Sequence, residues 1–191
     1  NGKANSVSGG GCLDKKIPKS EEPSDSFLYD PLNPVPSAGG AMLGPRSGIY
    51  LQNSIELRDD VLIYSTQPLS EPVEVTGPVR LIIYVHTNVV CTDFTAKLVD
   101  VYPNGNAYNL CDGILRRNYQ PIKNTEKVPV KIEIDLWPTS NVFMKGHKIR
   151  LEISSSNFPR YDRNLNTGEF IPEATKTVTA KQTIFHSDQY P

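Results

Sequence analysis

The stretch VPVKIEIDL, residues 128–136, constrains the fold of this chain more than any other. Its apolar residues alternate strictly with charged ones: Val128, Val130, Ile132, Ile134 and Leu136 against Lys131, Glu133 and Asp135. A period of two places the apolar side chains on one face of a β-strand and the charges on the other. A strand with one apolar face must bury that face against a second layer.

The same alternation, or a short apolar run, recurs along most of the chain. It predicts strands over 61–66, 78–87, 147–156 and 176–187, and a pair of strands within 93–116. Asn104-Gly105 lies between that pair and favours a hairpin turn, because both residues accept a positive φ. No stretch of useful length has helical periodicity. We therefore predict an all-β fold, a β-sandwich of the jelly-roll type with a galactose-binding-like architecture.

The start of the chain has a different composition from the rest. Residues 1–25 are Gly/Ser-rich and then Lys/Glu/Pro-rich, which predicts a polar, loosely ordered lead-in, and residues 26–191 are expected to form the sandwich. Three prolines within 27–40 favour an extended path that ends in a turn at Gly39-Gly40. Because the sequence opens at Asn1 without a methionine, we expect a fragment of something longer.

The composition argues against several classes of partner. Twenty Lys and Arg against 21 Asp and Glu, scattered along the chain, give no basic face for nucleic acid. No apolar run approaches the roughly 20 residues that a membrane span needs, and no signal-peptide pattern opens the chain. The three cysteines lack metal-ligand spacing, which favours reduced thiols and a cytoplasmic location.

Residues for catalysis or metal binding do not assemble in the sequence. A Gly-x-Ser-x-Gly motif is absent, and the serines that end the strand 147–156 have no histidine near them in sequence. The three histidines, His86, His147 and His186, are expected on solvated surfaces. The acidic residues Asp59, Asp60, Asp100 and Asp112 provide too few ligands in any one segment for a calcium site. We therefore predict no catalytic residue, no metal and no cofactor.

The segment SSSNFPRYDRN, residues 154–164, is the most polar cluster in the predicted sandwich. In a structural role, its polar residues cap strand ends and pair with each other, while Phe158-Pro159 fills an apolar gap. In a functional role, the ordered surface docks onto another domain. The candidate docking residues are Asn157, Phe158, Arg160, Tyr161, Asp162, Arg163 and Asn164.

Four segments carry a resemblance to a known family: YDPLNPVPSAGG, DFTAKLVDVYPNGNAYNLCDGILR, TSNVFMKGHKIRLEISSSNFPRYDRNLNTG and the terminal HSDQYP. They resemble the C-terminal domain of the serine hydrolases that include cocaine esterases, X-prolyl dipeptidyl aminopeptidases, α-amino acid ester hydrolases and glutaryl acylases. The resemblance implies a jelly roll that packs on an N-terminal α/β-hydrolase domain, its partner, which holds the catalytic Ser, Asp and His. It also implies that the chain is a trimmed piece, and it makes a homo-oligomer plausible.

The same resemblance implies a place in the wall of the substrate pocket for Met42 and Leu43, which follow the Gly-Gly turn. Gly44 departs from the family pattern, because an aromatic residue stands there in the cocaine-degrading type. That difference puts bulky aromatic esters in doubt as substrates. Simple core packing is the alternative role for Met42 and Leu43.

A free-standing carbohydrate-binding module is the alternative function. Tyrosines could stack on sugars if they were exposed and gathered on one face, and the candidates are Tyr50, Tyr102, Tyr108 and Tyr119. These tyrosines lie mostly at predicted loops and strand ends. The one tryptophan, Trp137, precedes a proline and is expected to pack at a strand end.

Overall fold

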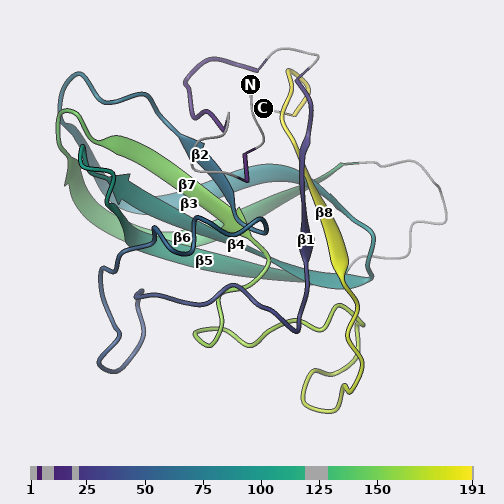
Figure 1. The fold of residues 1–191 in the computed structure, drawn as a ribbon. Coiled ribbons are helices and arrows are strands. Elements are labelled where there is room, and N and C mark those ends of the chain that lie inside the picture. Colours follow the sequence, from purple (N-terminus) through teal and green to yellow (C-terminus); the bar gives the residue numbers. More distant parts are fainter. Residues whose placement is uncertain (1–3, 6–10, 19–21, 119–128, 191) are drawn as a thin grey trace.

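The computed structural model describes residues 4–5, 11–18, 22–118 and 129–190. Two antiparallel sheets of four strands each pack face to face (Figure 1). The first has the order β1 (Asp25–Tyr29), β8 (Ala180–Phe185), β3 (Val73–Thr87) and β6 (Val130–Phe143). The second has the order β2 (Leu62–Ser65), β7 (Lys148–Ser154), β4 (Cys91–Val101) and β5 (Ala107–Asn118). The predicted all-β sandwich is confirmed, and no helix of the described residues could span a membrane.

The core lies between the two sheets and follows the alternation of the sequence. Ile132, Ile134 and Leu136 of β6 are buried, whereas the charged residues between them are exposed. Val128, the first residue of that predicted pattern, lies outside the described residues. The largest buried apolar side chains come from both sheets: Tyr29, Phe94, Phe143, Leu62, Ile134, Leu136 and Ile153. Each contributes roughly 1.5–3 kcal/mol when it leaves water, so this interface stabilises the domain.

Strands β4 and β5 form the predicted hairpin. Gly105 has a φ of 88°, and the amide of Tyr102 donates to the carbonyl of Asn106 at 2.8 Å. Unlike the other strands, β4 is buried along its whole length and on both faces. Its outer face is therefore covered by another part of the chain.

The segment that covers it is the connection between β1 and β2, residues 30–61, which we call the cover segment. It crosses the outer face of the second sheet (Figure 1). The amide of Gln52 donates to the carbonyl of Ala107 at 2.8 Å, and the amide of Tyr50 donates to Asn109 Oδ1 at 2.7 Å. A small apolar cluster around Val35 lies beneath it. The polar outer face of this sheet is thus interior.

The described part of the lead-in contacts the free edge of β2. The amide of Ile63 donates to the carbonyl of Ala4 at 2.7 Å, and the amide of Ser65 donates to the carbonyl of Gly11 at 3.1 Å. Ala4 is itself buried in the main core. These contacts extend the second sheet past its edge strand.

Asp25, at the start of β1, ties together four separate parts of the chain. Its Oδ2 accepts hydrogen bonds from Tyr64 Oη (2.9 Å) and His186 Nε2 (3.0 Å), and its Oδ1 accepts from the amide of Ala4 (3.3 Å). Burial acts to raise the pKa of Asp25, but these hydrogen bonds lower it overall. The hydrogen bond to Asp25 raises the pKa of His186, with nearby Glu22 adding to the effect. The prediction of a solvated His186 is wrong, because its side chain is half-buried in this ion pair.

His186→Ala is expected to lower the free energy of unfolding by about 1–2 kcal/mol at pH 5 and by much less at pH 8.5. The raised pKa of His186 gives stability below its unfolded value of 6.5 that is lost as the pH rises through the folded value. The lowered pKa of Asp25 gives stability above 3.8 that is lost on acidification. Urea unfolding at both pH values measures the difference, with the exposed Lys176→Ala as control. Equal losses at the two pH values would contradict the charged pair.

Candidate docking surface

The loop after β7 is held to the sandwich by its own polar residues. Asn157 Nδ2 donates to Asp112 Oδ2 at 2.8 Å, and Arg160 Nη1 forms an ion pair with Asp112 Oδ1. Asp112 lies on β5 and is buried. Burial raises the pKa of Asp112, although the positive charges of Arg160 and Lys97 oppose that rise. The start of the loop is thereby fixed to the outer face of the second sheet.

A second group of contacts fixes the end of the loop. Arg116 binds Asp93 through two hydrogen bonds of 2.8 and 2.7 Å, and it also reaches Asp162 at 3.1 and 3.2 Å. Asn164 Nδ2 donates to Asp93 Oδ1 at 2.8 Å. The hydrogen bonds that Arg116 donates to Asp93 and Asp162 raise the pKa of Arg116, which stays fully charged. Both ends of the loop are therefore clamped to β4 and β5.

These contacts correct two predictions about the loop. The polar residues were expected to pair with each other, but the ion pairs reach partners on β4 and β5. Phe158-Pro159 was expected to fill an apolar gap, but the side chain of Phe158 is 42% exposed. Its backbone pairs with the cover segment, since the amide of Phe158 donates to the carbonyl of Val35 at 2.9 Å. The loop thus turns Arg160 inward and leaves Asp162 and the ring of Phe158 exposed.

The remaining predicted docking residues are partly buried. Arg163 Nη1 donates to the carbonyl of Pro31 at 2.9 Å, which ties the loop to the start of the cover segment. The guanidinium of Arg160 lies 5.1 Å from the ring centre of Tyr161, a cation–π distance. The loop and the cover segment therefore form one continuous surface.

Residues 40–48, which we call the Leu43 loop, project from that surface. The loop closes at its neck, where the amide of Gly40 donates to the carbonyl of Gly48 at 2.8 Å and the amide of Gly48 donates back at 3.0 Å. Leu43, near its tip, is fully exposed, and Met42 is half-buried. Core packing, the alternative role for Leu43, is wrong.

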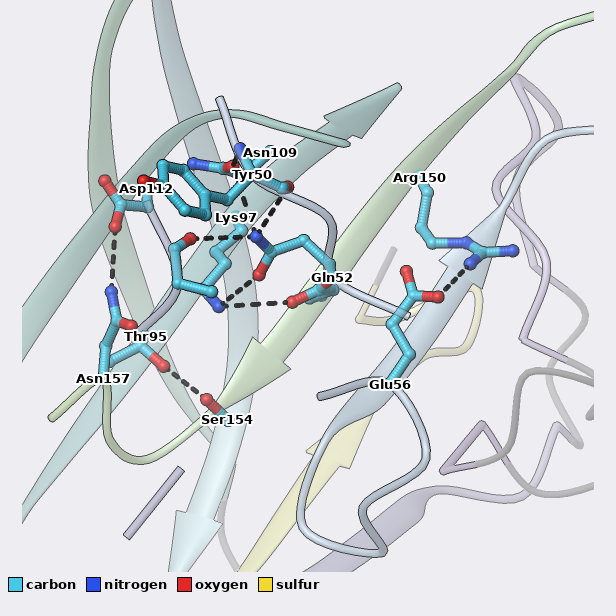
Figure 2. Close-up of polar contacts among 12 residues, drawn as sticks. Tyr50, Gln52, Glu56, Thr95, Lys97, Asn109, Asp112, Arg150, Ser154 and Asn157 are labelled. Carbon is cyan, nitrogen blue, oxygen red and sulfur yellow. Dashed lines mark hydrogen bonds and ion pairs between the residues drawn. The ribbon is translucent and has the colours of Figure 1, made fainter. Parts of the chain in front are cut away.

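A layer of buried charges lies under the cover segment (Figure 2). Lys97 Nζ of β4 donates to Gln52 Oε1 at 3.0 Å and lies 3.6 Å from Glu152 Oε2 of β7. Arg150 Nη1, also of β7, lies 2.6 Å from Glu56 Oε2 of the cover segment. All five side chains are buried. The cover segment is thus attached to the sheet through polar contacts as well as apolar ones.

One proton would satisfy two buried carboxylate oxygens in this layer. Glu56 Oε1 and Glu152 Oε1 are both buried without a donor among the described residues. Burial raises the pKa of Glu152 to about 7, and the neighbouring Glu56 adds to that rise while Lys97 and Arg150 oppose it. A proton on Glu152 that is donated to Glu56 satisfies both oxygens. The layer is therefore sensitive to pH.

The serines at the end of β7 have structural partners. Thr95 and Ser154 hydroxyls lie 2.6 Å apart, Ser155 accepts from Gln182 Nε2 at 3.1 Å, and Ser156 accepts from the amide of Val35 at 2.8 Å. Three or more potential metal ligands do not gather anywhere in the described part of the chain. These serines hold loops together and show no features of a nucleophile.

His147 does not lie on a solvated surface as expected. It is buried, and its Nδ1 lies 2.9 Å from Asp100 Oδ1 of β4. Its ring also stacks with Tyr102, with centroids 4.3 Å apart. His86 of β3 is half-buried, so the structure leaves none of the three histidines fully solvated.

The tyrosines considered for sugar binding that the structure describes make contacts within the domain. Tyr102 and Tyr108 pack edge to face, with centroids 5.1 Å apart, whereas Tyr50 donates to the carbonyl of Pro45 at the Leu43 loop. Tyr119 lies outside the described residues. Trp137 was expected to pack at a strand end, but it is 64% exposed with a φ of 70°, at an irregularity of the β3–β6 pairing.

Comparisons with known proteins agree with this architecture. The family model for the X-Pro dipeptidyl-peptidase C-terminal non-catalytic domain matches residues 4–191. The chain is 46% identical, over its full length, to the cocaine esterase of Rhodococcus sp. (strain MB1 Bresler) and covers 34% of that protein. A putative serine esterase of Mycobacterium bovis is 24% identical over 68% of the chain, which covers 23% of the esterase. The chain thus spans about a third or less of the curated relatives.

Solved structures of hydrolases contain the same fold as this chain. An aminopeptidase from a marine sediment Thaumarchaeota archaeon superposes with a TM-score of 0.83 at 26% identity, over 95% of this chain and 34% of its own. An α-amino acid ester hydrolase superposes with a TM-score of 0.81 at 25% identity, with the same coverage. The family match over nearly the whole chain and the high identity to one relative agree with the eight-stranded sandwich. This chain belongs to the family of X-Pro dipeptidyl-peptidase C-terminal non-catalytic domains.

Proposed function

We propose that this domain serves a serine α/β-hydrolase that acts on esters or amides, that it packs on the hydrolase domain, and that it shapes the substrate pocket. The relatives named as esterase, ester hydrolase and aminopeptidase support this, because each is about three times as long as the matching region. Buried, structurally bonded serines in this chain fit a role without chemistry of its own.

The exposure of Leu43 is the observation that carries the proposal. A leucine that projects fully from a closed loop leaves apolar surface in water, which a partner surface would cover. Phe158, on the loop that pairs with Pro36 of the cover segment, adds exposed aromatic surface. An interface of this kind has apolar anchors surrounded by polar residues.

In the proposed enzyme, acyl transfer takes place on the hydrolase domain, with a serine activated by histidine and an oxyanion hole. The residues of this domain contribute shape. Leu43 and Met42 would bound the space for the acyl group and exclude water from it. The clamped loop after β7 would keep the docking surface in one conformation, which lowers the entropy lost on docking.

Leu43→Ala in the full-length protein is expected to lower kcat/KM for a fitting ester by roughly ten- to two-hundredfold, the effect of losing a few buried methylenes from a pocket. Hydrolysis of p-nitrophenyl esters of increasing acyl length measures this. Leu28→Ala is the matched control, because Leu28 is an equally large, exposed residue on β1. Equal kcat/KM values for both variants and the wild type would show that Leu43 does not line the pocket.

A further inference from the structure

We propose that Arg160 is the positioning residue of the Leu43 loop, holding its neck in one place. The effect of Arg160 on the substrate pocket rests on the proposed function of Leu43. Three observations support this role: Arg160 contacts the neck, Arg160 is itself held by its neighbours, and Leu43 is exposed beyond the neck.

The neck lies directly against the guanidinium of Arg160. A Cβ atom added to Gly40 would overlap Arg160 Nη1 and would come within 3.3 Å of Asp112 Oδ2. Gly40 also has a φ of 103°, a conformation that residues with a side chain rarely adopt. Glycine is needed here both for the turn and for the close approach of the guanidinium. Arg160 therefore supports the backbone at the point where the loop begins.

Arg160 is itself fixed from several sides. Its side chain is 8% exposed, and its partner Asp112 is 3% exposed. Asn157 holds the second oxygen of the same carboxylate, and Tyr161 packs beside the guanidinium. A planar guanidinium bound in this way has one orientation, which a lysine ammonium cannot reproduce.

The other strand of the neck is attached to β5 through Tyr50, and beyond the neck Tyr50 Oη donates to the carbonyl of Pro45 at 3.0 Å. Asn109 Oδ1 accepts from the amide of Tyr50, and Gln52 Nε2 donates to the carbonyl of Ala38 at 2.9 Å. A Cβ atom at Gly44 or Gly48 would meet nothing within 4 Å. Leu43 projects from the surface beyond the neck, so the support of Gly40 by Arg160 helps to decide where Leu43 lies.

The test uses the full-length protein with Arg160→Lys, and the matched control is Arg80→Lys, at an exposed arginine of β3 that pairs with Glu133. The rate of hydrogen exchange in a peptide over residues 41–49 reports the stability of the neck. The ratio of kcat/KM for p-nitrophenyl acetate to that for p-nitrophenyl octanoate reports the shape of the pocket. We expect Arg160→Lys to speed exchange at least fivefold and to change the ratio about fivefold, with Arg80→Lys close to wild type. In a Leu43→Ala background, Arg160→Lys should leave the ratio unchanged while exchange still accelerates.

The two readouts separate this inference from the proposed function. Faster exchange in Arg160→Lys supports the positioning role, whatever the kinetics of Leu43→Ala. Unchanged kinetics in Leu43→Ala would contradict only the proposed function. Unchanged exchange and an unchanged ratio in Arg160→Lys, with altered kinetics in Leu43→Ala, overturn the positioning role. Asp112→Asn removes the charge that fixes Arg160 and leaves the sequence of the neck unchanged, so it provides the same test should Arg160→Lys fail to fold.

Discussion

Lys97→Met is expected to lower the free energy of unfolding by about 3–5 kcal/mol at pH 8, the cost of leaving a buried charge without its partner. Lys97 is buried, and it is the ammonium that faces Glu152 and Gln52 under the cover segment. Methionine fills a similar volume but supplies neither charge nor donor. Glu152 then has to lose its charge or remain unpaired in the interior, and Gln52 Oε1 loses its hydrogen bond. Urea denaturation of the 191-residue chain measures the loss.

The size of this loss should depend on pH. At pH 5 the Glu152 carboxyl is protonated in the folded state, since its pKa is raised to about 7, and it needs a countercharge less. The matched control is Lys131→Met, an exposed lysine on β6, which should change the free energy of unfolding by no more than about 0.5 kcal/mol. A loss below about 1 kcal/mol at pH 8 would mean that water reaches Lys97 and Glu152.

The strands were predictable because each has an apolar face, but the burial of the opposite face was not. The sequence DFTAKLV alternates as a half-exposed strand does, yet β4 is buried throughout. Alternation reports which residues share a face, and it does not report what covers that face. Residues 27–40, which include the start of the cover segment, were predicted as an extended path that ends in a turn at Gly39-Gly40, and both glycines have a positive φ. Only the packing of the cover segment on the second sheet makes Lys97, Arg150 and Glu152 interior residues.

The candidate site shows the same limit. The loop after β7 was found from its cluster of polar residues, but the direction of each side chain depends on acceptors far away in sequence. Asp93 and Asp112, on β4 and β5, attract the arginines and asparagines inward, and Phe158 is left outside. The sequence did show Asp93 and Asp112 within the predicted hairpin. It did not show that these carboxylates are buried, because their burial depends on other parts of the chain. The pairing of His147 with Asp100 was missed for the same reason.

Glu152→Gln is expected to flatten the pH dependence of stability. In the wild type, the raised pKa of Glu152 means that folding takes up a proton between pH 4.5 and about 7. Stability is then highest below pH 4.5 for this group and falls as the pH rises to about 7, with a slope of about 1 kcal/mol per pH unit. A glutamine has the shape of the protonated acid, donates to Glu56 at every pH, and removes this slope.

The raised pKa of His186 also makes stability fall as the pH rises in the upper part of that range. The comparison is therefore made in a His186→Ala background. There, the chain with Glu152 should still lose stability between pH 5 and pH 7, and the chain with Glu152→Gln should not. The charged groups around Glu152 are Lys97, Arg150 and Glu56. A slope that persists in Glu152→Gln would assign the proton to Glu56. A slope in the chain with Glu152 and a flat profile in the chain with Glu152→Gln would place the proton on Glu152.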